Sequence, residues 1–138
     1  MAYWYKIGLL VLNEDQTKFL VCEKDRTDIT NKYLMPGGQM EETDPMVCLK
    51  REIKEELNCK VDTTKVTYIG EYSDIAAGEP THEVIIDLYQ GELIGEPKPS
   101  SEVKYLHWIG KEDADNDNVS GIIRYKIIPS LVEKGVLK

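Results

Sequence analysis

The stretch that most constrains this chain runs from Leu34 to Cys59, where a glycine turn is followed by a short polar loop and a helical pattern. The turn has the sequence Pro36-Gly37-Gly38. Asp44 is suited to cap the start of a helix, and Pro45 suits the first helical position, where its missing amide hydrogen costs nothing. Neither glycine nor a further proline occurs before Leu57, so this pattern predicts a helix of about three turns from Pro45 to Leu57.

The predicted helix places a cluster of acidic residues beside an apolar stripe. The stripe consists of residues at helical spacing, namely Met46, Leu49, Ile53 and Leu57. Glu52, Glu55 and Glu56 fall on the adjacent sector, where their spacing makes them neighbours. Two like charges about 4 Å apart repel by a few kcal/mol near a protein surface, so the three carboxylates call for a cation. Mg²⁺ suits them best, because it prefers carboxylate oxygens and keeps waters and substrate phosphates in its shell.

Arg51 and the glycine turn fit the same site. Arg51 can pair with Glu55 on its own helix, or it can lie along the flank and hold Glu52 in one orientation. Gly37 and Gly38 allow bare backbone to approach a metal or a phosphate closely. A glutamate-rich helix alone is usually a solvated face, so the functional interpretation depends on its coupling to the turn.

The turn and the helix together resemble the signature of the Nudix (MutT-like) hydrolases. That signature reads Gly-x5-Glu-x7-Arg-Glu-U-x-Glu-Glu-x-Gly-U, with U aliphatic. The matching residues are Pro36-Gly37-Gly38 and Arg51-Glu52-Ile53-Lys54-Glu55-Glu56. The chain departs from the signature at two places. In the loop, Thr43 stands in place of the first glutamate when the spacing is counted from Gly37, and Asp44 is the nearest acid when it is counted from Gly38. At the helix end, Asn58 replaces the last glycine and Cys59 replaces the final aliphatic residue.

The resemblance implies an α/β fold of the Nudix-like α/β/α sandwich type, with a mixed β-sheet between helices, over a single domain spanning residues 1–138. It also implies hydrolysis of the pyrophosphate bond of a nucleoside diphosphate linked to another moiety, with Mg²⁺ as the cofactor or Mn²⁺ in its place. Glu52 or Glu56 would be the general base, and Arg51 would orient the cluster. The implied metal ligands are the main-chain carbonyl of Gly38 and the side chains of Glu52, Glu55 and Glu56.

Residues outside the signature complete the predicted site. Glu83 and Glu102 are candidates for one additional acid, and each is otherwise an ordinary surface acid. The expected substrate-binding residues are Arg26, Tyr33 and Gly37, because a phosphate needs positive partners and a tyrosine ring can stack on a base. Further cations that can border the cleft are Lys24, Lys32 and Lys104. The two histidines, His82 and His107, are interpreted as structural.

Composition narrows the function classes. At 138 residues the chain has the length of one domain. The formal net charge of −8 argues against binding to a nucleic acid duplex or to an anionic membrane. The three cysteines form no metal-ligand spacing and indicate reduced thiols in a cytoplasmic protein. The apolar run 7–12 is too short to span a bilayer. Relatives are often dimers, so a homodimer is possible.

The rest of the chain predicts strands around the helix. The strand patterns are Tyr3–Leu12, Lys18–Lys24, Lys65–Tyr72, His82–Leu93 and Val103–Ile109, the first two forming a hairpin. A loop is expected over 73–81, and the aspartate-rich stretch 111–118 lacks the glycine and glutamate of a calcium-binding EF-hand. Ser120 is expected to cap a last helix that Pro129 kinks or restarts. Its core-facing positions are Ile122, Ile123, Ile127, Leu131 and Val132.

The sequence contains few residues that indicate which substrate is used. A proline about fifteen residues after the signature, as in ADP-ribose hydrolases of the family, is absent, and Tyr72 falls slightly early for the dinucleoside-polyphosphate subgroup. A nucleoside triphosphate is therefore the default substrate. Two alternatives remain open: a Nudix-like domain that binds a nucleotide or a protein partner without turnover, and an interaction domain whose acidic helix meets a basic partner.

Overall fold

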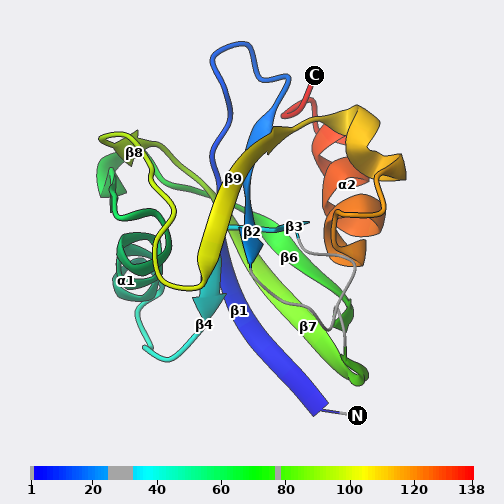
Figure 1. Cartoon of the computed structure of the whole chain (residues 1–138), viewed down its shortest axis with the longest axis horizontal. Coiled ribbons are helices and arrows are strands. Elements are labelled where there is room, and N and C mark those ends of the chain that lie inside the picture. Colours follow the sequence, from blue (N-terminus) through cyan, green and yellow to red (C-terminus); the bar gives the residue numbers. More distant parts are fainter. Residues whose placement is uncertain (1, 25–32, 77–78) are drawn as a thin grey trace.

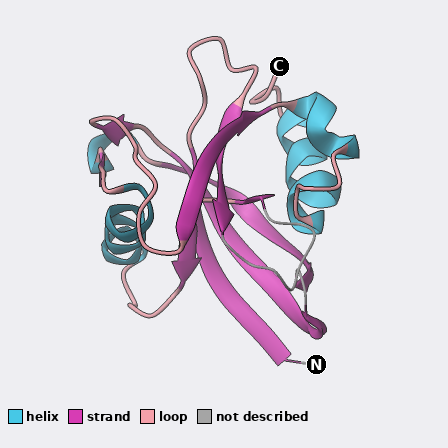
Figure 2. Ribbon diagram, viewed as in Figure 1, coloured by secondary structure: helices cyan, strands magenta, loops and turns pink. Residues whose placement is uncertain are grey.

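The structure is a computed structural model that describes residues 2–24, 33–76 and 79–138. Its β-sheets lie between two helical layers, with α1 (Pro45–Leu57) on one side and α2 (Ile128–Glu133) on the other (Figures 1 and 2). The α/β/α arrangement implied by the resemblance is confirmed.

The larger sheet is mixed. It has four strands in the order β4-β1-β7-β6, of which β1 and β7 run parallel and the other pairs antiparallel. Its strands are β1 (Ala2–Leu10), β4 (Gly37–Gln39), β6 (Thr67–Ala76) and β7 (Glu79–Gln90).

The smaller sheet is antiparallel, in the order β3-β2-β9, and a short antiparallel pair and two 3-10 turns complete the connections. The strands of the smaller sheet are β2 (Phe19–Lys24), β3 (Tyr33–Leu34) and β9 (Val103–Ile109). The short pair is β5 (Lys60–Val61) with β8 (Leu93–Ile94), and the 3-10 turns are Thr63–Lys65 and Lys111–Asp115.

Helix α1 begins and ends where the sequence predicts. The Asp44 side chain accepts a hydrogen bond from the Met46 amide at 2.9 Å, and Pro45 opens the helix. Asn58 ends it in the left-handed conformation, with φ 51° and ψ 42°, and its amide donates to the Lys54 carbonyl at 3.1 Å. Asparagine tolerates this backbone conformation because its short polar side chain can hydrogen-bond locally.

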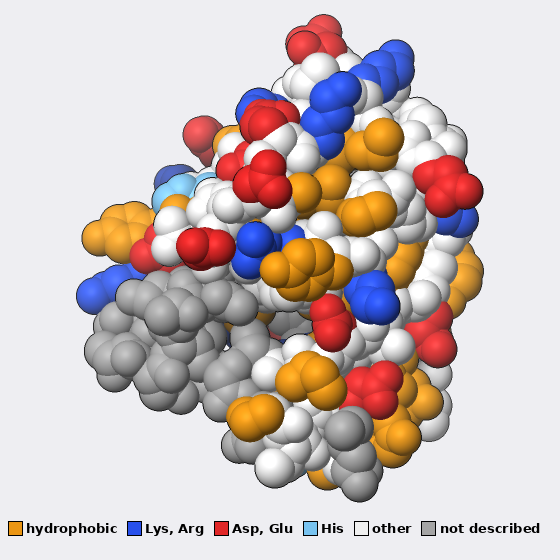
Figure 3. Space-filling model, turned by 90° about the vertical axis from the view of Figure 1, so that its right-hand side faces the viewer, with side chains coloured by type: hydrophobic (Ala, Val, Ile, Leu, Met, Phe, Trp, Pro, Cys, Tyr) orange, Lys and Arg blue, Asp and Glu red, His pale blue; other side chains and the backbone are white. Residues whose placement is uncertain are grey.

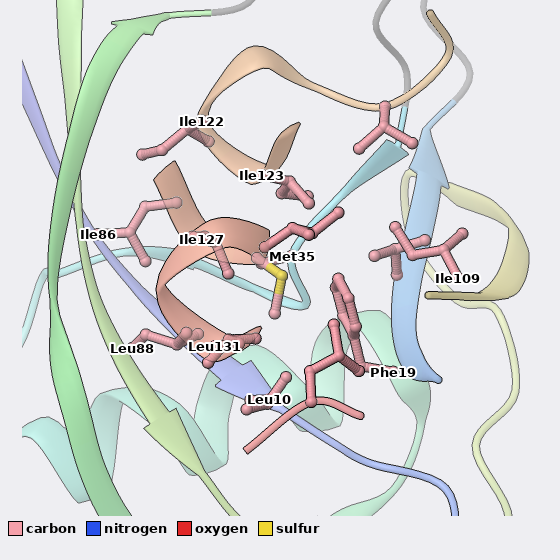
Figure 4. Close-up of a cluster of buried hydrophobic side chains, with 14 of the residues drawn as sticks. Leu10, Phe19, Met35, Ile86, Leu88, Ile109, Ile122, Ile123, Ile127 and Leu131 are labelled. Atoms are coloured by element: carbon pink, nitrogen blue, oxygen red, sulfur yellow. The ribbon is translucent and has the colours of Figure 1, made fainter. Parts of the chain in front are cut away.

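Two hydrophobic cores lie on opposite sides of the sheets. Leu49, Ile53 and Leu57 of α1 are fully buried in one core. The other core lies between the sheets and the last helical segment (Figure 4). Figure 4 labels ten of its residues, which are Leu10, Phe19, Met35, Ile86, Leu88, Ile109, Ile122, Ile123, Ile127 and Leu131.

The last helical segment differs in detail from the expectation. Residues Ile123–Ile127 are π-helical, and Pro129 lies in the first turn of α2, which follows directly. Because a π-helical stretch has a wider turn, it shifts the angular phase of the residues after it. The prediction that Val132 faces the core is therefore wrong: it is 41% exposed.

Two predictions about the strands also require correction. The expected hairpin between the first two strands exists only at its turn, where Leu12 bridges Phe19, because β1 pairs with β4 and β7 while β2 belongs to the other sheet. The expected loop over 73–81 is largely strand, since β6 continues to Ala76 and β7 starts at Glu79. Pro80 is tolerated there because pairing of β7 with β1 begins only at His82, so its missing amide is not needed by β1.

No helix in residues 2–24, 33–76 and 79–138 has both the length and the apolar character needed to cross a membrane. On the face that carries α2, acidic and basic side chains are interspersed with hydrophobic ones (Figure 3).

Candidate active site

The glycine turn is held against β1 and against helix α1. Gly37 and Gly38 pair with Gly8 and Ile7 of β1. Gly37 has a φ of 139°, and a Cβ there would collide with the Ile7 carbonyl. A Cβ on Gly38 would overlap the Glu52 carboxylate. Both glycines are therefore required, one by its backbone conformation and one by the close approach of an acidic side chain.

Glu56 is the most enclosed polar group of the site. It is 6% exposed, and its Oε1 accepts a hydrogen bond from the Gly37 amide at 2.8 Å. Its Oε2 lies 3.1 Å from the Lys24 ammonium. Burial raises the pKa of Glu56, and this effect is opposed by Lys24 and by the Gly37 amide. Burial therefore disfavours the charged form of this carboxylate, while Lys24 and the Gly37 amide favour it.

Arg51 gathers the neighbouring acids. Its Nε and Nη2 bind the two oxygens of Glu42 at 2.7 and 3.0 Å, while Nη1 lies 2.8 Å from Glu52 and 3.3 Å from Glu55. Both roles left open by the sequence are therefore present. These hydrogen bonds raise the pKa of Arg51 and lower the pKa of Glu42. Asp44, which the sequence offered as the nearest loop acid, caps the helix instead.

Glu52, Glu55 and Glu56 border a polar groove of about 290 Å³. Glu52 is 8% exposed, whereas the Glu55 side chain is 53% exposed. The groove is lined by oxygen-bearing and basic side chains and by the glycine turn, namely Lys6, Lys24, Gly37, Gly38, Gln39, Glu41, Glu52, Glu55, Glu56, Ser101 and Glu102. The structure thus brings together the acidic trio, the glycine turn and Glu102.

Other predicted residues lie elsewhere. Glu83 lies on β7 outside the lining of the groove. Tyr33 stacks on His107 with ring centroids 4.3 Å apart and also lies outside that lining. Arg26 falls outside the described residues, as does Lys32.

The two histidines have the local contacts of structural residues. His107 Nε2 lies 2.8 Å from a Glu23 carboxylate oxygen. The His82 ring packs against Trp4 with ring centroids 4.3 Å apart and the ring planes tilted by 31°. Each histidine is thus engaged by a neighbouring side chain in its own sheet.

Sequence reasoning missed Glu42 and Lys6. Two adjacent acids at Glu41 and Glu42, in a loop that must pass Arg51, are the signal that could have indicated Glu42. Lys6 alternates within β1 between apolar positions, and only the pairing of β1 with β4 places it at the groove.

The donor set fits a hard divalent cation. The side chains of the groove supply carboxylate oxygens, and the bare Gly38 backbone leaves its main chain close to Glu52. In the described part of the chain, no group of three His, Cys, Asp or Glu side chains is already arranged to hold a metal. The reason is visible in the contacts: Glu52 is bound by Arg51 and Glu56 by Lys24. A cation at Glu56 would replace the Lys24 ammonium.

A second, largely apolar cavity of about 60 Å³ adjoins the groove. Four residues, Lys6, Lys24, Gly37 and Gly38, line both spaces. The remaining lining of the second cavity comes from β1, the segment before β4, β6, β7 and the start of the last helical segment; it consists of Trp4, Ile7, Leu34, Met35, Ile75, Ala76, Val84, Ile86, Ser120, Gly121 and Ile122.

Comparison with solved structures shows the same fold in several relatives. A MutT protein from Methanosarcina mazei Go1 superposes with a TM-score of 0.76 at 20% identity, covering 96% of both chains. The E. coli ORF135 protein gives a TM-score of 0.71 at 15% identity, covering 96% of this chain and 91% of that one. A C. elegans Ap4A hydrolase gives 0.66 at 16% identity, covering 97% of both chains.

Comparison of the sequence with family descriptions is decisive, although no curated protein matches the chain. The NUDIX domain description matches residues 3–131, which is most of the chain. The match includes the glycine turn, helix α1 and the strands that form the groove. The chain therefore belongs to the Nudix family of pyrophosphohydrolases, as its Arg51–Glu56 helix had indicated.

Proposed function

We propose that this protein hydrolyses the pyrophosphate bond of a nucleoside diphosphate linked to another moiety, with a nucleoside triphosphate as the first candidate substrate. The observation that carries the proposal is the burial of the Glu52 and Glu56 carboxylates against the bare Gly37–Gly38 backbone at the edge of an oxygen-lined groove. Burying carboxylates is costly unless they are paired or bind a cation, and the ion pairs with Arg51 and Lys24 keep these two carboxylates in place beside the groove.

The cofactor of the proposed reaction is Mg²⁺, for which Mn²⁺ can substitute. Glu52, Glu55, Glu56 and the Gly38 carbonyl would hold it. When bound, such an ion neutralises phosphate oxygens and lowers the pKa of a coordinated water.

The chain's own residues account for orientation and proton transfer. Arg51 holds Glu52 and Glu55 and thereby fixes both carboxylates at the groove. Lys6 and Lys24 provide positive charge for the diphosphate. Water attacks one phosphorus, the bridging P–O bond breaks and two phosphorylated products leave. Glu52 or Glu56 accepts the proton of the water, and burial raises the pKa of Glu56, which supports that residue as a base.

The contacts of Tyr72 leave the triphosphate as the preferred substrate. The Tyr72 hydroxyl is 2.7 Å from Ser130 Oγ of α2, and Tyr72 lies outside the lining of the groove. It is therefore not placed to stack on a second nucleoside of a dinucleoside polyphosphate. The likeness to the C. elegans Ap4A hydrolase is one of fold at 16% identity.

The test is a nucleotide panel with products resolved by chromatography. The panel contains deoxynucleoside triphosphates, ADP-ribose, NADH, nucleotide sugars and dinucleoside polyphosphates, each with Mg²⁺, with Mn²⁺ and with chelator. We expect products only with metal. Glu56→Gln should lower kcat at least a hundredfold with its fold unchanged, and Glu133→Gln, an exposed change on α2, should not affect it.

Other outcomes identify the alternatives. Saturable nucleotide binding without products would show a silent binding domain, and neither binding nor products would favour an interaction domain. We also propose that the protein is cytoplasmic, which the three buried free cysteines support. We propose that it forms a homodimer, which light scattering would test.

A further inference from the structure

The apolar cavity beside the groove contains one polar side chain that has no evident structural use. Ser120 lines the cavity and is 2% exposed. Its Oγ is buried and has no hydrogen-bond partner among the described residues. Figure 4 shows Met35, Ile86 and Ile122, three other residues of the lining, converging from separate elements on the same core. The surroundings of this hydroxyl are thus largely hydrocarbon.

The main chain of Ser120 explains why its hydroxyl stays in place. Its amide donates to the Tyr33 carbonyl at 3.0 Å, and its carbonyl accepts hydrogen bonds from the amides of Ile123 and Arg124, both at 3.1 Å. The expectation that the Ser120 side chain caps the last helix is not met, because the hydroxyl makes no such bond. A buried hydroxyl without a partner is unfavourable, and an alanine would fit the same backbone at lower cost. Folding alone therefore does not account for a serine here.

The position of the cavity relative to the groove suggests what reaches this hydroxyl. Lys6, Lys24, Gly37 and Gly38 form the boundary between the two spaces. A diphosphate over the glutamates would therefore have its attached moiety at the mouth of the apolar cavity. Trp4 also lines the cavity and adds an aromatic side chain to it; its ring packs against His82 with the two ring planes tilted by 31°.

We propose that the apolar cavity receives the edge of the substrate's nucleobase and that Ser120 Oγ hydrogen-bonds to a polar atom on that edge, which makes Ser120 a specificity-determining residue. This inference rests on the proposed nucleotide hydrolysis and deepens it. A planar heteroaromatic ring matches an apolar cavity with one hydroxyl, whereas the many hydroxyls of a sugar would lose their hydration without partners there. The expected substrate class is nucleoside di- or triphosphates, and diphosphates without a ring are disfavoured.

The test measures binding separately from hydrolysis. Nucleoside monophosphates carrying each of the common bases are titrated into the chelator-treated full chain, with tryptophan fluorescence and calorimetry as readouts. The wild type should prefer one base or one pair of bases. Ser120→Ala should weaken binding of the preferred base about twofold to twelvefold, as for the loss of one hydrogen bond, and should flatten the ranking of bases.

The melting temperature distinguishes recognition from a structural role. Ser120→Ala should melt at the same temperature as the wild type or higher, because it removes an unpaired buried hydroxyl. The matched control is Ser130→Ala, which removes a serine hydroxyl that is bonded to Tyr72 outside the cavity. This control should lower the melting temperature and leave the ranking of bases unchanged.

Each result bears on the proposal in one direction. An unchanged ranking in Ser120→Ala, absence of monophosphate binding by the wild type, or a fall in melting temperature with the ranking intact would overturn the role of Ser120. Hydrolysis of triphosphates with Mg²⁺ is measured on the same preparations. Hydrolysis with an unchanged ranking refutes this inference alone, and base-selective binding without hydrolysis refutes the proposed function alone.

Discussion

Replacing Lys24 with methionine tests whether Glu56 is held as a charged group in a balance that a cation can take over. Lys24 Nζ lies 3.1 Å from Glu56 Oε2, and the side chains are only 18% and 8% exposed. At an effective dielectric constant of about 20 this separation corresponds to an attraction of about 5 kcal/mol, most of which offsets desolvation. Lys24→Met keeps the length and apolar stem of the side chain and removes the charge.

The loss of stability can be bounded. Removing one partner of a buried ion pair typically costs about 3–5 kcal/mol, because the other charge stays buried. Glu56 can escape by taking up a proton, and for a carboxyl with an ordinary pKa of about 4.3 this costs about 3.7 kcal/mol at pH 7 and about 1 kcal/mol at pH 5. We therefore expect Lys24→Met to lower the free energy of unfolding by about 2–4 kcal/mol at pH 7 and by about 1 kcal/mol at pH 5.

The sign of the pH dependence follows from the pKa of Glu56. Burial already raises it above its unfolded value, and loss of Lys24 removes the largest opposing effect. The folded chain then binds the proton more tightly than the unfolded chain, so stability falls as pH rises from the unfolded pKa through the folded one. The difference between Lys24→Met and wild type should accordingly widen between pH 5 and pH 8.

Urea unfolding at several pH values measures this difference, and the chain offers a matched control. Lys65 Nζ also lies 3.1 Å from a glutamate oxygen, that of Glu92, but both side chains are more than 60% exposed. Lys65→Met should therefore lower the free energy of unfolding far less than Lys24→Met does. Equal losses for the two methionine variants, or a loss at Lys24 that does not change between pH 5 and pH 8, would refute the reasoning.

Metal binding gives an independent readout of the same pair. If Mg²⁺ takes the place of the ammonium at Glu56, Lys24→Met should bind Mg²⁺ at least fivefold more tightly in calorimetric titrations at pH 8, where no ammonium has to be displaced and proton uptake by Glu56 competes least. The double variant Lys24→Met with Glu56→Gln should recover much of the lost stability, because no buried charge remains, and should lose the metal-dependent stabilisation. Weaker Mg²⁺ binding by the single variant would show that Lys24 does not compete with the ion.

Two further changes address the rest of the groove. Gly38→Ala should lower kcat/KM at least tenfold and lower the melting temperature, because its Cβ would overlap the Glu52 carboxylate; a variant that keeps both would show that this close approach is unimportant. Glu42→Gln should lower kcat several-fold by loosening the Arg51 fork, whereas Glu41→Gln, whose oxygen lies 3.6 Å from Arg51, should have little effect. Steady-state kinetics that rank the two glutamine variants in the opposite order would contradict the assignment.

The parts of the fold that the sequence predicts are those specified by local chemistry. The cap at Asp44, the first-turn Pro45 and the left-handed Asn58 each act within one helical turn, so the bounds of α1 are those expected. Helical periodicity wrongly predicted that Val132 faces the core. The π-helical stretch before α2 shifts the 100° spacing on which that prediction rests.

The parts that could not be predicted depend on contacts between distant segments. The register of β6 with β7 extends both strands into a stretch whose glycine and proline indicate a loop, and strand pairing of this kind is not visible in either segment alone. Glu42 could not be chosen over Thr43 or Asp44 from spacing, because the path of the loop decides which acid meets the Arg51 fork. Ser120 was expected to cap the last helix, and only the absence of a hydrogen bond from its buried hydroxyl shows otherwise.

The shared boundary of the two spaces also explains how an acidic protein can bind an anionic substrate in one direction. The net charge of −8 repels a nucleotide at long range, but physiological salt screens charges beyond about 8 Å. The lining of the groove is itself acidic, so the proposed Mg²⁺ would have to supply most of the attraction, with the two lysines adding to it. Lys6 and Lys24 stand where groove and cavity meet. In the reverse orientation the phosphates would enter the apolar cavity, where a charge without partners is very costly, and the ring would lie over the carboxylates. On the proposed function, the arrangement would therefore set the direction in which the substrate binds as well as the choice of base.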